Sequence, residues 1–248
     1  MTKIESAGRI RYVDIANAET LRELNKYNQA IPLNEIVETD FILGEKNLPE
    51  LVGDKLYDYV IASHVIEHVP DMLGWLIEIG EVLKDNGILS LAIPDKRYTF
   101  DYLRNLSTPG KLIEDYLVHR RRPGPGEVFD FAFNARKVDV IHAWEGTLDK
   151  TTLEHFIDLQ GAFFLAKYSL ENYKDVHINV LTPASFLDLI EIACHLELMD
   201  FTIVDFYDTA HNTVEFIVSM ERIPRKENRK KSLSRQLASI NRARERIS

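Results

Sequence analysis

The pattern of apolar positions is clearest between Tyr57 and Asp95. The continuous apolar run Tyr59–Ala62 predicts a strand buried on both faces. Apolar residues then recur at helical spacing over Met72–Leu83, and Gly87 is expected to end this helix in the left-handed conformation. A second apolar run, Ile88–Ile93, predicts another buried strand. Strand, helix and strand with short links indicate a βαβ unit, in which the two strands are parallel.

Weaker patterns on both sides of this unit extend the predicted sheet. The further expected elements are a helix from about Asn17, a helix over Pro183–Leu196, and strands at Arg11–Ile15, Ile36–Phe41, Phe201–Phe206 and Thr213–Met220. Clean alternation in the last strand is typical of a strand less buried than the central ones. The sequence therefore predicts an α/β fold with a doubly wound, mostly parallel sheet that ends in an antiparallel hairpin.

The stretch Phe100–Val176 has no strand pattern. Apolar residues at 112–117 and 153–168 predict helices, separated by the Pro- and Gly-rich run Arg120–Gly126. A helical insertion at about 100–176 would lie above the carboxyl ends of the strands, where α/β sheets bind ligands. It is either a cap over the substrate or a part of the scaffold.

Composition narrows the class of protein. Of the 248 residues, 45% are hydrophobic and 28% are charged, which is typical of a globular protein. The single cysteine, Cys194, excludes an intrachain disulfide and a cysteine zinc site, and its helical pattern predicts a buried thiol. No apolar run reaches the roughly 18 residues of a membrane span, so we expect a cytoplasmic protein.

The charge is distributed unevenly along the chain. Thirty Lys and Arg face 39 Asp and Glu, a net charge of −9, yet residues 222–248 carry ten basic and two acidic groups, or +8. The predicted domain, residues 1–221, is therefore at −17, which argues against nucleic-acid binding. In the tail, Leu233, Leu237 and Ile240 have helical spacing. This tail is expected to contact an anionic membrane surface, a partner or the acidic body of the protein, or else to be a frayed terminus.

The amino-acid sequence of the βαβ unit resembles that of class I S-adenosylmethionine-dependent methyltransferases, most closely the type-11 group. The resemblance rests on Tyr57–Asp71, Glu81–Leu89 and Ile93–Asp95, which match the fourth strand, crossover helix and fifth strand of that family. It implies a Rossmann-like methyltransferase fold, S-adenosylmethionine as the cofactor and methyl transfer as the activity.

The chain departs from the family at the first strand and its glycine-rich loop. Gly8 is the only glycine before the strand that matches the second strand of the family. Either the chain is a piece of a longer product, or the cofactor site is truncated or remodelled. In an alternative alignment Ile10–Ile15 is the first strand and Ala16, Asn17 and Ala18 replace the glycines. The spacing from Asp40 to Tyr57 favours the first alignment.

The resemblance also implies cofactor-binding residues. Asp14, at a strand end, matches the acid that accepts hydrogen bonds from the ribose hydroxyls, although a carboxylate there could equally interact with a helix N-terminus. Asp40 and Phe41 match the adenine-contacting position. Ser63 and His64 would border the cofactor pocket.

His64 is the first candidate for a catalytic residue. Its ordinary pKa near neutrality suits a general base, although a packing role is also open. Residues 64–68 read His-x-x-Glu-His, a zinc-protease pattern that needs a continuous helix. Because a strand precedes His64, Pro70 follows and the sequence offers no obvious third ligand, no metal site is predicted.

Polar residues on the expected ligand side point to a polar or anionic acceptor. Asp95, a second catalytic candidate, is followed by Lys96 and Arg97, and these cations would bind the acceptor together with His142 and His177. Arg120–Arg122 would either bind a phosphate or complement a helix end.

Two functions of different classes remain open. The first is O-methylation of a small polar or glycan acceptor, and the second is a cofactor-free, methyltransferase-like binding or scaffold protein. A nucleotide-sugar transferase on the same framework is a third. Because a missing central strand would leave a free sheet edge, we expect a homo-oligomer or an intimate partner protein.

Overall fold

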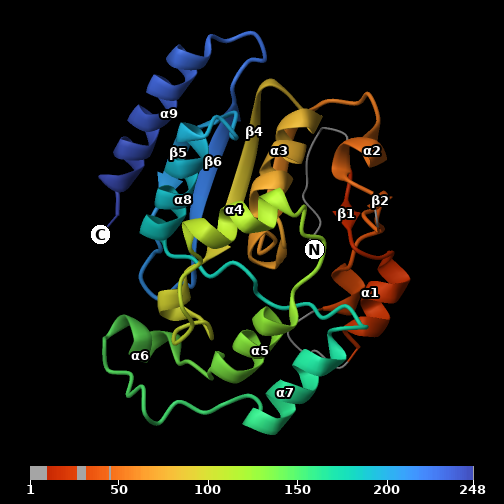
Figure 1. Cartoon of the computed structure of the whole chain (residues 1–248), viewed down its shortest axis with the longest axis vertical. Helices are drawn as coiled ribbons and strands as arrows, with labels where there is room; N and C mark the ends of the chain where they lie inside the picture. The colour runs from red at the N-terminus through yellow and green to blue at the C-terminus, as the bar shows by residue number, and fades with distance from the viewer. Residues whose placement is uncertain (1–9, 27–31, 45, 248) are drawn as a thin grey trace. The chain divides into compact units, whose positions relative to one another are not determined.

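The computed structural model describes residues 10–26, 32–44 and 46–247 (Figure 1). The chain divides into two compact units, residues 1–56 and residues 57–248. Each unit is described by itself.

The first unit is built on two short parallel strands, β1 (Val13–Asp14) and β2 (Phe41–Ile42). Helix α1 (Ala18–Leu24) begins where predicted, because the Asn17 side chain accepts a hydrogen bond from the Thr20 N–H and caps the helix. The 3-10 turn η1 (Leu33–Glu35) and helix α2 (Leu48–Val52) complete the unit.

The two predicted strands of this unit are shorter than expected, and the second is displaced. Strand β2 starts at Phe41, whereas the prediction was Ile36–Phe41. The side chain of Asp40 accepts from the Tyr12 N–H at 2.9 Å, and the Asp40 and Phe41 N–H groups both donate to the Tyr12 carbonyl. These contacts replace a regular ladder before Phe41.

The second unit contains a four-stranded sheet in the order β3-β4-β6-β5. Strand β3 is parallel to β4, and the pairs β4-β6 and β6-β5 are antiparallel. Helix α3 (Met72–Val82) connects β3 to β4, so the predicted βαβ unit is confirmed, as is the closing hairpin. The strands are β3 (Tyr57–Ser63), β4 (Leu83–Pro94), β5 (Phe201–Tyr207) and β6 (Glu215–Arg222).

One face of this sheet holds the core. Phe216, Val218 and Met220 of β6 are fully buried, and Phe216 packs 5.8 Å from Phe186 of helix α8 (Pro183–His195), a helix predicted from the sequence. On the other face Tyr59 is 65% exposed and Ile61 is 59% exposed. The prediction that Tyr59–Ala62 is buried on both faces is therefore wrong.

Two further details differ from the predictions for physical reasons. Strand β6 lies between β4 and β5 and is not a peripheral strand, because the strand before it in the chain takes the edge. Helix α3 ends at Val82 and not at Gly87, and its C-cap residue Leu83 is extended. The left-handed residue is Asn86, at φ 63° within β4. A Cβ on Gly87 would meet the Lys84 carbonyl at 3.0 Å, so close packing favours glycine at this position.

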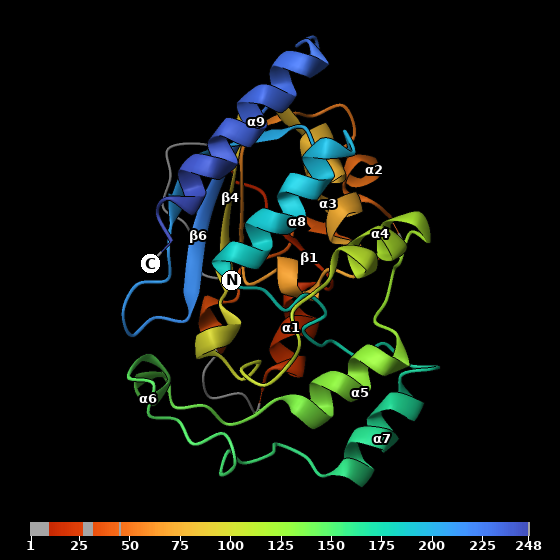
Figure 2. The ribbon, with the colours of Figure 1, turned by 60° about the vertical axis from the view of Figure 1, so that its left-hand side comes forward.

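The insertion is helical, as predicted, and contains more helices than the pattern indicated. In Figures 1 and 2 helices α5, α6 and α7 lie together beyond the end of β4. Arg120 pairs with Asp115, and Arg122 donates to the Ser169 carbonyl, so both arginines stabilise helix ends. The insertion helices are α4 (Pro109–Leu117), α5 (Pro125–Asn134), α6 (Val140–Trp144) and α7 (Leu159–Tyr168).

The basic tail forms helix α9 (Arg229–Arg244), which runs beside β5 and α8 in both views (Figures 1 and 2). Its Gln236 side chain donates to the Phe201 carbonyl, and its Ser239 hydroxyl accepts the Ile203 N–H. Arg244 pairs with Asp188 and with Glu191 of α8. The helix thus satisfies the outer edge of β5 and contacts the acidic body of the protein.

Two predictions from composition can be compared directly with the structure. Cys194 is buried, and burial raises the pKa of its thiol to about 12, so the thiol is unreactive at neutral pH. Among the described residues, no helix combines the length and the apolar character that a bilayer crossing requires.

Candidate functional site

Asp14 is the candidate ribose-binding residue of the first unit, and it occupies the end of β1. Its Oδ1 accepts the Ile15 N–H at 2.7 Å. Within the described residues its second carboxylate oxygen has no partner and is available to a ligand. A half-buried carboxylate at the carboxyl end of a parallel strand suits recognition of a vicinal diol.

Asp40 has a different environment from the one the resemblance implied. It lies at the start of β2, where its carboxylate pairs with Arg11 at 2.6 Å and accepts the Tyr12 N–H. The Tyr12 N–H, with a further contribution from Arg11, lowers the pKa of Asp40 below its usual value. Asp40 and Tyr12 also line a pocket of about 730 Å³ in the first unit, and Phe41 follows in β2. An adenine-binding role for Asp40 and Phe41 stays a prediction.

In the second unit, the polar side chains gather where β3 ends at Ser63. His64 has a left-handed φ of 52°, and its N–H donates to the Ala92 carbonyl of β4. The ring contacts Glu215 at the start of β6 through Nε2. The carboxylates of Glu67 and Glu215 together raise the pKa of His64 to about 9, although partial burial opposes them. His64 is therefore mainly protonated at neutral pH, contrary to the expectation of a base with a pKa near neutrality.

Glu67 is the most unusual group in this region. Its side chain is fully buried, and both carboxylate oxygens lack a hydrogen bond to any described residue. Oε1 lies 3.4 Å from His64 Nδ1, 3.9 Å from His68 Nε2 and 3.9 Å from His177 Nε2. A buried carboxylate without hydrogen bonds is costly unless a charge compensates it.

Two of these histidines are held in place by acidic partners. His68 Nδ1 lies 2.9 Å from Asp175 Oδ1, and His177 Nδ1 lies 2.6 Å from Asp101 Oδ2. Burial alone would lower the pKa of His68, but Asp175 outweighs it and the pKa is raised. Both histidine Nε2 atoms are therefore left to face Glu67.

Backbone contacts bring these distant segments together. The Ile178 and Asn179 N–H groups donate to the Glu67 carbonyl, at 2.7 and 3.0 Å. The Asn179 side chain donates to the Ile66 and Val69 carbonyls, at 2.8 Å each. The buried extended stretch 176–181 is thus fixed against the 3-10 turn η2 (Ile66–His68), and His177 meets Glu67.

Asp95 is fully buried and bound to its own chain. Its carboxylate accepts from the Arg97 N–H at 2.9 Å and from the Thr209 hydroxyl at 2.8 Å, and it pairs with the Arg97 guanidinium at 2.7 Å. Lys96 donates through Nζ to the Tyr102 carbonyl at 2.9 Å. Asp95 is thus the N-cap of the 3-10 turn η3 (Lys96–Tyr98), and these contacts hold the turn in place after β4.

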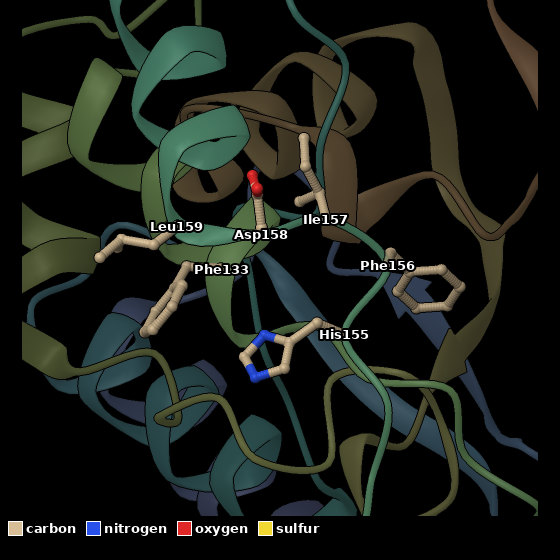
Figure 3. A pocket seen from close by; sticks show the side chains of 6 residues that line it. All are labelled: Phe133, His155, Phe156, Ile157, Asp158 and Leu159. Carbon is tan, nitrogen blue, oxygen red and sulfur yellow. The ribbon is translucent and has the colours of Figure 1, made fainter.

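The insertion contains a pocket of about 460 Å³ with largely aromatic and aliphatic walls (Figure 3). Phe133 of α5 and His155 lie on one side, with ring centroids 5.5 Å apart. Phe156 of the pocket also faces Phe100, whose ring lies 4.6 Å from that of His177. Ring contacts through Phe100 thus link this pocket to His177. His142, in contrast, is exposed on α6 and contacts Thr147 at 2.9 Å.

Residues 10–122 match the family model described as a methyltransferase domain. This segment is similar to methyltransferase domains. The match includes β1 to β4, so the predicted resemblance and the α/β fold class are confirmed. The predicted site residues Asp14, Asp40, Phe41, Ser63, His64, Asp95, Lys96 and Arg97 fall within the matched segment.

A solved structure titled StiE O-MT, residues 961–1257, aligns with 95% of the chain at 12% identity and a TM-score of 0.32. The chain spans 65% of the length of that structure. The search of curated proteins gave no match.

The cluster around Glu67 was missed at the sequence level. The sequence motif at residues 64–68 needs a continuous helix, and the structure has none there: His64 follows β3 with a left-handed φ, and the short 3-10 turn η2 covers only Ile66–His68. The third histidine, His177, was predicted separately as an acceptor-binding residue. Its distance of 110 residues from Glu67 in the sequence concealed their contact.

Proposed function

We propose that this protein is an S-adenosylmethionine-dependent methyltransferase that methylates a hydroxyl group on a small polar or glycan acceptor. The observation that carries the proposal is the match of residues 10–122 to a methyltransferase domain. The location proposed for the protein is the cytoplasm.

The residues of the first unit fit the adenosine part of the cofactor. At the end of β1, one carboxylate oxygen of Asp14 has no hydrogen bond to a described residue. It can accept a hydrogen bond from a ribose hydroxyl group. Residues 1–12 contain one glycine, Gly8, and no Gly-x-Gly pattern. When bound, the cofactor would supply an electrophilic methyl group, and Asp14 would orient its ribose.

The second unit provides groups that suit a hydroxyl acceptor. The His64 side chain is 42% exposed. It lies at the carboxyl end of β3, next to Glu215. Its ring nitrogens face Glu215 and Glu67, so the protonated ring can attract an acceptor oxygen by its charge and so orient the hydroxyl group. The aromatic walls formed by Phe133 and Phe156 are suited to stacking on a ring of the acceptor.

Binding of S-adenosylhomocysteine tests the proposal most directly. Calorimetry on the full chain should show about one ligand per chain, and Asp14→Ala should weaken binding by at least about tenfold, the value of one lost hydrogen bond to a charged group. Asp54→Asn, an exposed acid in the same unit, should bind like the wild type. Transfer of a radiolabelled methyl group to a panel of sugars and phenols would then identify the acceptor.

The Asp40 carboxylate already pairs with Arg11 and accepts the Tyr12 N–H. This favours a second candidate, a methyltransferase-like binding or scaffold protein that does not use the cofactor. No heat with millimolar S-adenosylhomocysteine would support this candidate and contradict the first. Association with a second copy or with another protein is proposed for both. Light scattering over a wide concentration range would contradict self-association if only a monomer were found.

A further inference from the structure

The cluster formed by Glu67, His68 and His177 has a geometry that the proposed methyl transfer does not explain. One ligand atom from each residue lies within 4.8 Å of the others. The carboxylate at its centre is fully buried and has no hydrogen bond within the described chain, while two imidazole Nε2 atoms face it at 3.9 Å. These separations are too long for hydrogen bonds and leave space between the three groups.

We propose that Glu67, His68 and His177 bind a divalent transition-metal ion. Ligands arranged tetrahedrally around an ion at about 2.0–2.1 Å lie roughly 3.3 Å apart, so modest side-chain movements from 3.9 Å would close the site. The ion adds positive charge beside the buried carboxylate, which is otherwise approached by the His64 ring at 3.4 Å. Three protein ligands leave at least one coordination position for water or an oxygen of a bound molecule.

The surroundings of the two histidines support a metal site independently of the ligand atoms. Asp175 and Asp101 each contact the Nδ1 atom of one histidine, at 2.9 and 2.6 Å. These bonds place the proton on Nδ1 and direct the Nε2 lone pair toward Glu67. Carboxylates in this position orient and strengthen histidine ligands in metal sites.

The donor set selects the class of metal. Two imidazoles and one carboxylate suit zinc, iron(II), cobalt(II) or manganese(II), whereas magnesium and calcium prefer oxygen ligands. Because Cys194 is a lone buried thiol outside the cluster, no sulfur ligand is involved. Zinc is therefore the appropriate first probe, and magnesium is the matched negative control.

The test is zinc binding by the full chain after treatment with a chelator, measured by calorimetry without the methyl-donor cofactor. We expect one zinc ion per chain and no comparable binding of magnesium. His177→Ala and the isosteric Glu67→Gln should each weaken zinc binding by more than about 100-fold. Asp101→Asn removes a partner of His177 and should weaken it by about 10–100-fold.

His195→Ala is the control, because this exposed histidine lies on α8 outside the cluster and its replacement should leave zinc binding unchanged. Circular dichroism checks that each variant is folded, and Glu67→Gln decides if His177→Ala does not fold. The proposal is wrong if wild-type protein binds no zinc, or if Glu67→Gln binds it as tightly as the wild type. Neither result would bear on binding of S-adenosylhomocysteine, which is measured separately.

Discussion

Replacing Phe216 by alanine is expected to destabilise the second unit by about 3–5 kcal/mol. The side chain is fully buried in β6, between β4 and β5. Its ring packs 5.8 Å from Phe186 and 6.2 Å from Phe206, so its removal leaves a cavity bounded by a helix and a strand. Urea unfolding at equilibrium, followed by circular dichroism, measures the change.

The neighbouring residue provides a matched control. Ile217 points to the opposite face of β6 and is 41% exposed, so Ile217→Ala should cost less than about 1 kcal/mol. Equal costs at both positions would contradict the one-sided core. If the cost at Ile217 also depended on protein concentration, a second molecule would be covering this face in solution.

Most helices and strands of the second unit could be predicted from the sequence, because the apolar spacing and the end residues of each element are local. Pro183 at the first turn and the apolar period up to Leu196 were sufficient for α8, and alternation in β6 was sufficient for the hairpin. Burial was harder to predict. The run Tyr59–Ala62 is apolar at every position, yet Tyr59 and Ile61 are exposed, since apolar composition does not specify how many faces are covered.

The candidate site could be predicted only in part, because its central contacts join distant segments. Asp14 ends a strand and His64 follows one, and the family resemblance places both at the carboxyl ends of strands, where α/β sheets bind ligands. The meeting of Glu67 with His177 depends on the hydrogen bonds that tie residues 178 and 179 to the Glu67 carbonyl. No periodicity in residues 100–176 encodes that contact.

Asp95→Ala is expected to destabilise the protein by about 3 kcal/mol, although Asp95 was predicted to be catalytic. The buried carboxylate holds the Arg97 side chain, caps η3 and accepts the Thr209 hydroxyl. Removing one partner of a buried ion pair costs about 3–5 kcal/mol, and the partial exposure of Arg97 places this case at the lower end. Thermal unfolding should show a decrease of roughly 6–12 °C.

A surface pair separates this effect from a general effect of charge. Asp58 pairs with Lys84 at 2.7 Å, but both side chains are at least half exposed, so Asp58→Asn should change stability by less than about 1 kcal/mol. An Asp95→Ala variant with wild-type stability and no methyl transfer would overturn the structural role and restore the catalytic one. Retained S-adenosylhomocysteine binding together with reduced stability would instead identify Asp95 as the residue that holds η3 in place after β4.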